Sequence, residues 1–496
     1  MQKQSIFFNP TNVYELKNVI CSLKDKAGGT DGIHTIVLKK MCDYICIPLT
    51  HIFNLCLNEG VFPEHFKYAE IIPIYKSSSK SQTTNYRPIA LISNIAKILE
   101  KIIHKRLSDY LEKYNLISTK QFGFLKNLGT ADALASTVDF LYDKLGKSKP
   151  TAAVFLDLAK AFDSVDHNIL IDKLYFYGIR GTASNLIKSY LNNRNQCVKV
   201  NGVKSSYKTI GQGVPQGTIL GPLFFIIYIN DMLMLIKDII AYADDTVVMC
   251  SENSWSEVER QLNSYLNVIY NWLYSNKLVL NLEKTHFIAF GNHNDTIPSN
   301  LNILINNYKL DRAWKIKYLG VYLDCNLRWN EHISWVTNKL KYLVYVFARF
   351  KKSMCKVVLL KLYYGLFSSI ANYGIISWGS ARKTIFKKLS NLQTRIIKII
   401  FTNVDNTNKP LTIKQNYYVE AVLRDYKLLS KLFSKSRKKT RNESLPLPKH
   451  RIGVAEKNYS YTAIKVFNLL PIHLRTLKSN YSTIRKLIVN QVRYMD

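Results

Sequence analysis

The chain has 496 residues, of which 47% are hydrophobic and 12% aromatic. This composition excludes wholesale disorder, and the length predicts about three folded domains. Lys and Arg number 69 against 35 Asp and Glu, so the net charge is +34. Residues 331–496 hold 32 basic and 7 acidic residues, a net charge of +25. Charge so concentrated predicts a polyanionic partner, of which nucleic acid is the commonest, with an anionic membrane surface as the main alternative.

Two stretches near the start of the chain have the apolar spacing of a helix. Residues 11–25 form the first, which ends in a glycine-containing loop at residues 27–32. Ser93 is placed to cap the second, a long amphipathic helix. Its apolar face repeats at i, i+3, i+4 and i+7 and consists of Ile95, Ile98, Leu99, Ile102, Ile103, Leu107, Tyr110 and Leu111.

The apolar period changes at residue 151. Residues 151–158 form a short apolar run after Pro150, which predicts a buried strand, and residues 169–176 return to helical spacing. Gly221-Pro222 is placed to open a further apolar helix.

The next segments predict a small sheet. Residues 239–249 indicate two buried strands joined by an acidic turn at Ala243-Asp-Asp245. Further strands are expected within residues 277–290 and 314–323, and helices from Asn330 to the end of the chain. This order predicts an α+β protein whose helices cover one side of a small sheet.

Three carboxylates are candidates for metal chemistry. Asp157 lies at the end of the first strand, and Asp244 and Asp245 lie at the tip of the hairpin. If the two segments are neighbours in one sheet, the charges repel each other unless a cation neutralises them. A pair of Mg²⁺ ions would neutralise them and would suit in-line phosphoryl transfer. An Asp-Asp pair on its own is more often an ordinary surface turn.

An ordered set of motifs strengthens the prediction that these carboxylates take part in metal chemistry. Three of them are Phe155-Leu-Asp-Leu-Ala-Lys-Ala-Phe-Asp-Ser-Val-Asp-His167, Gly213-Val-Pro-Gln-Gly-Thr-Ile-Leu-Gly-Pro222 and Tyr242-Ala-Asp-Asp245. Others are Ile72-Pro-Ile-Tyr-Lys76, Asn85-Tyr-Arg-Pro-Ile-Ala-Leu91, Gln121-Phe-Gly-Phe124, Asn281-Leu-Glu-Lys-Thr285 and Tyr318-Leu-Gly-Val-Tyr-Leu-Asp324. Over roughly residues 10–480 the sequence resembles the reverse transcriptases of non-LTR (LINE-type) retrotransposons, of the jockey/CR1 group.

The resemblance implies a right-hand polymerase fold of the α+β class, with fingers, a ferredoxin-like palm and a helical thumb. The expected domains are an N-terminal extension with fingers (residues 1–150), a palm (151–330), a thumb (331–400) and a basic, mainly helical C-terminal extension (401–496). The reverse transcriptase core would cover about residues 70–325.

The implied activity is RNA-directed DNA polymerisation. The expected partners are an RNA template, a DNA primer or target and deoxynucleoside triphosphates, with two Mg²⁺ ions, or Mn²⁺ as the alternative, and no membrane. The eight cysteines form no Cys-x-x-Cys pair and predict an intracellular protein. The nucleus and cytoplasm are the expected compartments.

The resemblance also assigns catalytic roles. Asp157 and Asp244 match the two metal-binding aspartates of the family, and Asp245 matches the third, supporting carboxylate. Lys284 matches a lysine proposed to protonate the pyrophosphate leaving group, with a plain surface lysine as the alternative.

Binding roles follow in the same way. Phe162 matches the ring that excludes a ribose 2′-hydroxyl, with ordinary core packing as the alternative. Lys76 and Arg87 match basic finger residues near the triphosphate or template, although simple surface charges remain open. Gln216 and Gly217 match the family residues that contact the template and the incoming nucleotide. Tyr318, Leu319 and Gly320 match the hairpin that grips the primer 3′ end.

One departure from the family pattern concerns the fingers. Leu125 and Leu128 occupy positions where the family usually has Arg, and the first of these Arg residues contacts the triphosphate. This departure leaves open a catalytically impaired, nucleic-acid-binding relic of such an element. A group II intron-type reverse transcriptase with maturase function, which shares the palm motifs, is the other alternative. No segment resembles the endonuclease that complete elements carry, an RNase H or a Cys/His knuckle.

Overall fold

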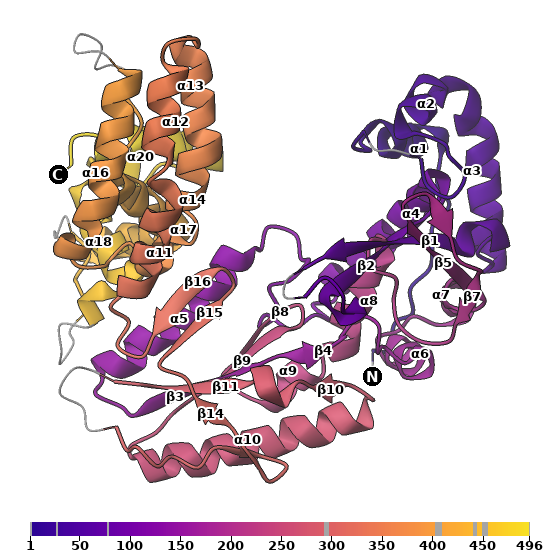
Figure 1. Ribbon diagram of the computed structural model, residues 1–496, viewed down its shortest axis with the longest axis horizontal. Helices are drawn as coiled ribbons and strands as arrows, with labels where there is room; N and C mark the ends of the chain where they lie inside the picture. Colours follow the sequence, from indigo (N-terminus) through magenta and orange to yellow (C-terminus); the bar gives the residue numbers. More distant parts are fainter. Residues whose placement is uncertain are drawn as a thin grey trace. The chain divides into compact units, whose positions relative to one another are not determined.

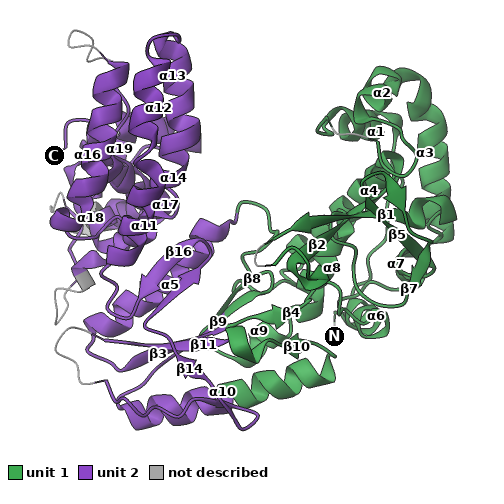
Figure 2. Ribbon diagram, in the orientation of Figure 1, with its two compact units in different colours: residues 1–127, 156–246, 265–284 green, residues 128–155, 247–264, 285–496 purple. Residues whose placement is uncertain are grey.

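The computed structural model describes residues 2–25, 28–76, 79–291, 297–401, 409–439, 444–448 and 455–495. Figure 1 shows its helices and strands. The chain divides into two compact units, each assembled from three segments (Figure 2). Unit 1 comprises residues 1–127, 156–246 and 265–284, and unit 2 comprises residues 128–155, 247–264 and 285–496. The fold is α+β, as the sequence predicted.

Unit 1 combines a mixed sheet with helices. The sheet has the strand order β2-β1-β5-β6, and β7 pairs with β5. Strand β1 is antiparallel to β2 but parallel to β5, which follows it by more than a hundred residues. The strands are β1 (Tyr68–Tyr75), β2 (Tyr86–Leu91), β5 (Arg194–Val200), β6 (Val203–Lys204) and β7 (Lys208–Ile210). The helices are α1 (Val13–Cys21), α2 (Thr35–Lys40), α3 (Cys42–Glu59), α4 (Asn94–Lys113), α6 (His167–Phe176), α7 (Gly181–Leu191), α8 (Leu220–Ile229) and α9 (Met232–Leu235).

Two of these helices form much of the apolar core of unit 1. Ser93 caps α4, as predicted, because its side chain accepts hydrogen bonds from the amides of Ile95 and Ala96. The predicted apolar face of α4 is buried apart from Ile95, which is half-buried. Every residue of α8 except Pro222 is buried.

A second five-stranded sheet has the order β14-β11-β3-β9-β8. Strands β3 and β11 run antiparallel, from the pair Phe155 and His286 to the pair Thr151 and Phe290. Strand β4 pairs separately with β10. The strands are β3 (Thr151–Leu156), β4 (Leu158–Ala159), β8 (Ile239–Tyr242), β9 (Asp245–Ser251), β10 (Val279–Leu280), β11 (His286–Phe290) and β14 (Asp311–Arg312).

Strands β4, β8 and β10 belong to unit 1 and strands β11 and β14 to unit 2, while β3 and β9 contribute residues to both. Outside its strands unit 2 is mostly helical, and Figure 1 shows its C-terminal helices packed together. Helix α10 (Trp255–Ser275) contributes residues to both units. Two small hairpins are β12 (Leu304–Ile305) with β13 (Tyr308–Lys309) and β15 (Lys315–Tyr318) with β16 (Val321–Asp324). The helices are α5 (Thr130–Gly146), α11 (Asn330–Leu340), α12 (Leu343–Phe350), α13 (Lys356–Leu362), α14 (Ser369–Ala371), α15 (Ile375–Trp378), α16 (Lys383–Ile400), α17 (Ile413–Lys439), α18 (Tyr459–Leu469), α19 (Ile472–Arg475) and α20 (Tyr481–Val492).

Several predicted boundaries shift by a few residues. The first predicted strand ends at Leu156, so Asp157 lies between β3 and β4. Residues 277–290 hold two strands, β10 and β11, separated by a 3₁₀ turn at Leu282–Lys284. Residues 314–323 fold as the β15–β16 hairpin, because Leu319 and Gly320 turn the chain with φ of 43° and 83°. The helical prediction after Asn330 is confirmed for the described residues.

Candidate functional site

Asp157 and the Asp244–Asp245 pair lie in unit 1 at the ends of strands. Ala243 and Asp244 form the two-residue turn between β8 and β9, and Asp245 begins β9. Ala243 has a positive φ of 56°, as a tight hairpin turn requires. The carbonyl oxygen of Asp157 accepts a hydrogen bond from the amide of Asn281 at 2.8 Å.

The segment at residues 120–123 supports the aspartate turn. The Gln121 side-chain oxygen accepts hydrogen bonds from the amides of Ala243 (3.0 Å) and Gly123 (2.7 Å). The amide of Phe122 donates to the carbonyl of Ala241 at 2.8 Å. A Cβ added at Gly123 would lie 2.4 Å from the amide nitrogen of Ala243, so only glycine fits there. This contact gives the Gln121-Phe-Gly-Phe124 motif a structural role that the sequence did not show.

The carboxylates at this turn influence each other electrostatically. Burial raises the pKa of Asp244, and the charge of Asp157 raises it further. The pKa of Asp245 is raised to about 6, first by loss of hydration and then by the charges of Asp244 and Asp157. The Asp245 side chain lies at the surface directly after Asp244, and the like charges of the two carboxylates repel each other there.

Lys76 and Arg87 act on the same carboxylates. Lys76 directly follows β1, and its amide donates a hydrogen bond to the carbonyl of Asn85 at 2.9 Å. Arg87 is a residue of β2 and pairs with Ile74 of β1. Both side chains are exposed. Their positive charges lower the pKa of Asp244, and that of Lys76 also lowers the pKa of Asp245. The structure therefore brings two predicted basic residues within electrostatic range of the predicted acidic ones.

The donor chemistry of the three aspartates fits a divalent cation, because carboxylate oxygens that repel each other are stabilised by a hard cation. The side chains of these aspartates are not arranged as a complete set of metal ligands. Within the part of the chain that the structure describes, no group of three or more His, Cys, Asp or Glu side chains is arranged to hold a metal ion.

Gln216 and Gly217 lie in the loop before α8, against β2. The Gln216 carbonyl accepts from the amide of Ala90 at 2.7 Å, and its side-chain amide donates to Asp163 at 3.1 Å. Gly217 has a φ of 107°, and a Cβ there would lie 2.9 Å from the Ala90 oxygen. This close approach requires glycine.

The loop is also anchored by Glu100, which the sequence analysis missed. Glu100 is fully buried on α4 and accepts hydrogen bonds from the Ile219 amide (2.7 Å) and the Tyr190 hydroxyl (3.0 Å). Burial raises its pKa, and the nearby charge of Arg194, itself buried, lowers it. The sequence signal that could have identified Glu100 is a carboxylate next to Leu99, on the apolar face of the predicted helix.

Phe162 is half-buried between two other rings. It stacks on Phe225 with centroids 4.5 Å apart and meets the edge of Phe124 at 6.2 Å. This packing holds the ring in a defined orientation, and it is compatible with both a gate and a core residue.

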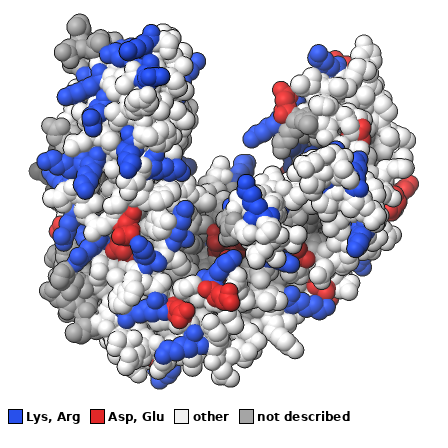
Figure 3. Space-filling view, in the orientation of Figure 1, with Lys and Arg blue, Asp and Glu red and all other residues white. Residues whose placement is uncertain are grey.

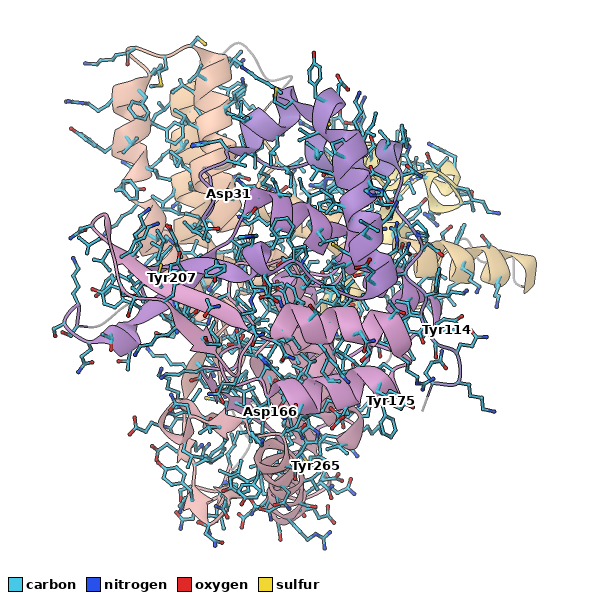
Figure 4. The ribbon with its side chains drawn as sticks, turned by 90° about the vertical axis from the view of Figure 1, so that its right-hand side faces the viewer. Asp31, Tyr114, Asp166, Tyr175, Tyr207 and Tyr265 are labelled. Atoms are coloured by element: carbon cyan, nitrogen blue, oxygen red, sulfur yellow. The ribbon has the colours of Figure 1, made fainter. Side chains whose placement is uncertain are left out.

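Lys284 is exposed at the end of the 3₁₀ turn, and its amide donates to the carbonyl of Asn281, the residue bonded to Asp157. The preceding segment is tied down by an ion pair of 2.7 Å between Lys277 and Asp166. Asp166, labelled in Figure 4, also caps α6 by accepting from the Asn168 and Ile169 amides. The main chain before Lys284 is therefore fixed beside Asp157.

Tyr318, Leu319 and Gly320 lie in unit 2, in the β15–β16 hairpin. Tyr318 is buried and packs against Phe155 at 5.3 Å between centroids. The carbonyl of Leu319 accepts from the Tyr373 hydroxyl at 2.8 Å, which fixes the turn. The last residue of the motif, Asp324, accepts from the amides of Arg328 and Trp329 and so closes the loop after β16.

Comparison with known proteins decides the family. The family model described as "Reverse transcriptase (RNA-dependent DNA polymerase)" matches residues 74–323, just over half of the chain. The chain belongs to the reverse transcriptase family. The matched range contains the three aspartates, Lys76, Arg87 and the turn of the β15–β16 hairpin.

The chain is similar to polymerases of mobile elements. It is 29% identical to "RNA-directed DNA polymerase from mobile element jockey" of Drosophila melanogaster, over 80% of this chain and 44% of that protein. The jockey polymerase of Drosophila funebris is 31% identical over 79% of this chain and 44% of that protein. The chain therefore spans less than half the length of these relatives. The resemblance to non-LTR retrotransposon reverse transcriptases is confirmed.

Among solved structures, the chain is similar to telomerase from Candida albicans in complex with a fragment of telomeric RNA. The match covers 78% of this chain and 72% of the telomerase chain, with 13% sequence identity and a TM-score of 0.41. This superposition is too partial to bear on function. Among the described residues, no helix is long and apolar enough to cross a membrane.

Proposed function

We propose that this chain copies an RNA template into DNA, extending a primer 3′-hydroxyl with deoxynucleoside triphosphates. The observation that carries the proposal is the grouping of Asp157, Asp244 and Asp245 within electrostatic range of Lys76, inside the matched reverse transcriptase region. Primer extension on a defined RNA template tests it. Full-length DNA product is expected, and a nucleic-acid-binding relic would bind the primer and template without extending the primer.

Reverse transcriptases use divalent metal ions, and we propose Mg²⁺, with Mn²⁺ as the alternative. Asp157 and Asp244 would hold the ions, with Asp245 as the supporting carboxylate. Bound there, the ions would activate the primer hydroxyl and neutralise the charge that develops on the phosphates.

The remaining residues would bind and orient the substrates. Lys76 and Arg87 would attract the triphosphate or template, because both are exposed cations whose fields reach the aspartates. Lys284 would donate a proton to the departing pyrophosphate. Gln216 and Gly217 would contact template and nucleotide through the loop that Glu100 anchors, and the hairpin at Tyr318, Leu319 and Gly320 would grip the primer.

The predicted division into fingers, palm, thumb and C-terminal extension, and the nuclear and cytoplasmic location, stay predictions. The two units are each discontinuous along the chain, so they do not test contiguous domain boundaries.

Adding Mg²⁺ to metal-free protein is expected to raise the melting temperature more at pH 7.5 than at pH 5. The pKa of Asp245 is about 6 in the folded chain, above the usual 3.8, so the folded state binds more protons than the unfolded state between these values. Metal-free stability should therefore fall as pH rises through this window, and a cation should restore it at neutral pH. At 100 times its Kd the ion would stabilise by about 2.7 kcal/mol.

Differential scanning fluorimetry measures this shift. The variant Asp244→Asn/Asp245→Asn should lose the Mg²⁺ response, whereas Asp172→Asn, an exposed carboxylate on α6, should keep it. An equal response at both pH values would show that Mg²⁺ binds elsewhere.

Phe162→Ala is expected to admit ribonucleotides. The ring is held by its stack on Phe225, so removing it clears space for a 2′-hydroxyl. Ribonucleotide incorporation relative to deoxynucleotide incorporation should rise about ten-fold or more, which corresponds to roughly 1.4 kcal/mol. Phe162→Tyr keeps the ring and is the control. If the Ala variant excludes ribonucleotides as strongly as the wild type, Phe162 is a packing residue only.

Leu125→Arg is expected to improve use of deoxynucleotides. Leu125 is half-buried and the neighbouring Lys126 is exposed. A charge-assisted hydrogen bond to the triphosphate is worth roughly 1.5–3 kcal/mol, so kcat/KM should rise about ten-fold or more, mainly through KM. Steady-state kinetics with a melting curve measures this. Unchanged efficiency at unchanged stability would mean that another residue already makes the contact.

A further inference from the structure

A basic pocket lies in the C-terminal region of unit 2, outside the matched reverse transcriptase region. Its volume is about 640 Å³, and it is lined by α17, by the segment after α19 and by α20. Four of its lining residues are the lysines Lys427, Lys431, Lys435 and Lys478, and none is acidic. Figure 3 shows that Lys and Arg side chains also outnumber acidic ones on the visible face of the unit 2 helices.

The four lysines are free to meet a ligand. Each side chain is exposed, and among the described residues no ion pair with a carboxylate is recorded for any of them. Lys427, Lys431 and Lys435 are spaced i, i+4 and i+8, so they follow one face of α17 at steps of about 6 Å. A row of cations at this spacing suits a ligand whose negative charges also repeat, rather than a single small anion.

Hydroxyl groups lie between the lysines. Ser430, Ser434, Thr476 and Ser479 also line the pocket. Ser434 donates to the carbonyl of Ser430 at 2.9 Å, which leaves its oxygen as an acceptor. No hydrogen bond of the Ser430 or Ser479 hydroxyl is recorded within the described part of the chain, so both can donate to phosphate oxygens.

The floor of the pocket is fixed before any ligand binds. Tyr426 and Ile484 are buried. The Tyr426 hydroxyl donates to the carbonyls of Leu474 and Leu477, which attaches the segment after α19 to α17. Arg475 holds the same segment through a 2.7 Å hydrogen bond to the carbonyl of Leu470. Lys478 therefore faces the α17 lysines from a restrained loop.

We propose that this lysine pocket binds the phosphate backbone of a nucleic-acid strand, as a contact additional to the polymerase site. The repeated lysines and the intervening hydroxyls match the charges and acceptors of successive phosphates, and contacts to phosphates carry no direct sequence information. Binding should therefore be independent of sequence. Leu428 and Leu432 are also exposed on α17, so an anionic lipid surface is the competing ligand that the test must separate.

The test compares two triple variants of the full chain with equal net charge. The pocket variant is Lys427→Gln/Lys431→Gln/Lys478→Gln. The control variant is Lys388→Gln/Lys465→Gln/Lys486→Gln, which removes three exposed lysines of unit 2 that do not line the pocket. Fluorescence anisotropy measures binding to a labelled single-stranded RNA and a DNA of the same sequence, without nucleotides and over a range of salt. Melting curves check that both variants fold.

The pocket variant should bind RNA or DNA at least ten-fold more weakly, and its slope of log K against log salt should fall by about 2, as expected for three lost phosphate contacts on a single strand. The control should change affinity less than three-fold. Equal losses in both variants would show diffuse attraction and overturn the proposal. So would unchanged nucleic-acid binding with lost binding to vesicles of phosphatidylcholine and phosphatidylserine. Because no catalysis is measured, a failure of primer extension in the wild type leaves this outcome unaffected.

Discussion

Replacing Asp157 or Asp244 with Asn is expected to abolish primer extension while leaving RNA binding intact. An Asn side chain has nearly the shape of Asp but no charge, so it cannot neutralise a divalent cation or hold it in place. Loss of this clamp should lower the extension rate by at least about 10³-fold, which corresponds to roughly 4 kcal/mol of transition-state stabilisation. Gel-resolved primer extension at saturating nucleotide measures the rate.

Stability distinguishes this effect from misfolding. Burial and the charge of Asp157 raise the pKa of Asp244, so its ionised form is disfavoured in the folded chain. Removing that charge should therefore leave the metal-free melting temperature unchanged or higher at pH 7.5. Asp172→Asn on α6 is the matched control and should extend primers normally. Extension near the wild-type rate by either site variant would refute the assignment of these aspartates.

Replacing Glu100 with Leu is expected to destabilise unit 1 strongly. The carboxylate is fully buried and accepts from the Ile219 amide and the Tyr190 hydroxyl. Leucine would leave both donors without an acceptor and would leave buried Arg194 without its nearby negative charge. Leaving a buried charge uncompensated costs about 3–5 kcal/mol. The loop that carries Gln216 and Gly217 would also lose its anchor, so the extension rate should fall.

The double variant Glu100→Leu/Arg194→Met separates charge from packing. If the uncompensated guanidinium causes most of the loss, the double variant should be more stable than Glu100→Leu alone. Urea denaturation gives both free energies of unfolding. Glu100→Gln keeps an acceptor for the Ile219 amide and should lie between the wild type and the Leu variant. A Glu100→Leu variant as stable as the wild type would show that the buried carboxylate does not support this loop.

Local features of the chain could be predicted because their causes are local. The cap at Ser93 depends only on the amides of the next turn, and the apolar face of α4 depends on a period of 3.6 residues. The hairpin around Asp244 follows from two apolar runs separated by a short polar turn. The ordered set of motifs, including those around Asp157 and Asp244, identified the family by resemblance.

Contacts between distant segments were decided only by the tertiary structure. Nothing in the spacing of the sequence indicates that β1 pairs with β5 in parallel, or that the Gln121 side chain holds the amide of Ala243. The same is true of Glu100, because a charge on an apolar helix face is stable only where other segments supply donors, here Ile219 and Tyr190. The residue types for catalysis could be read from the sequence, whereas the supports that position them depend on packing between segments more than a hundred residues apart.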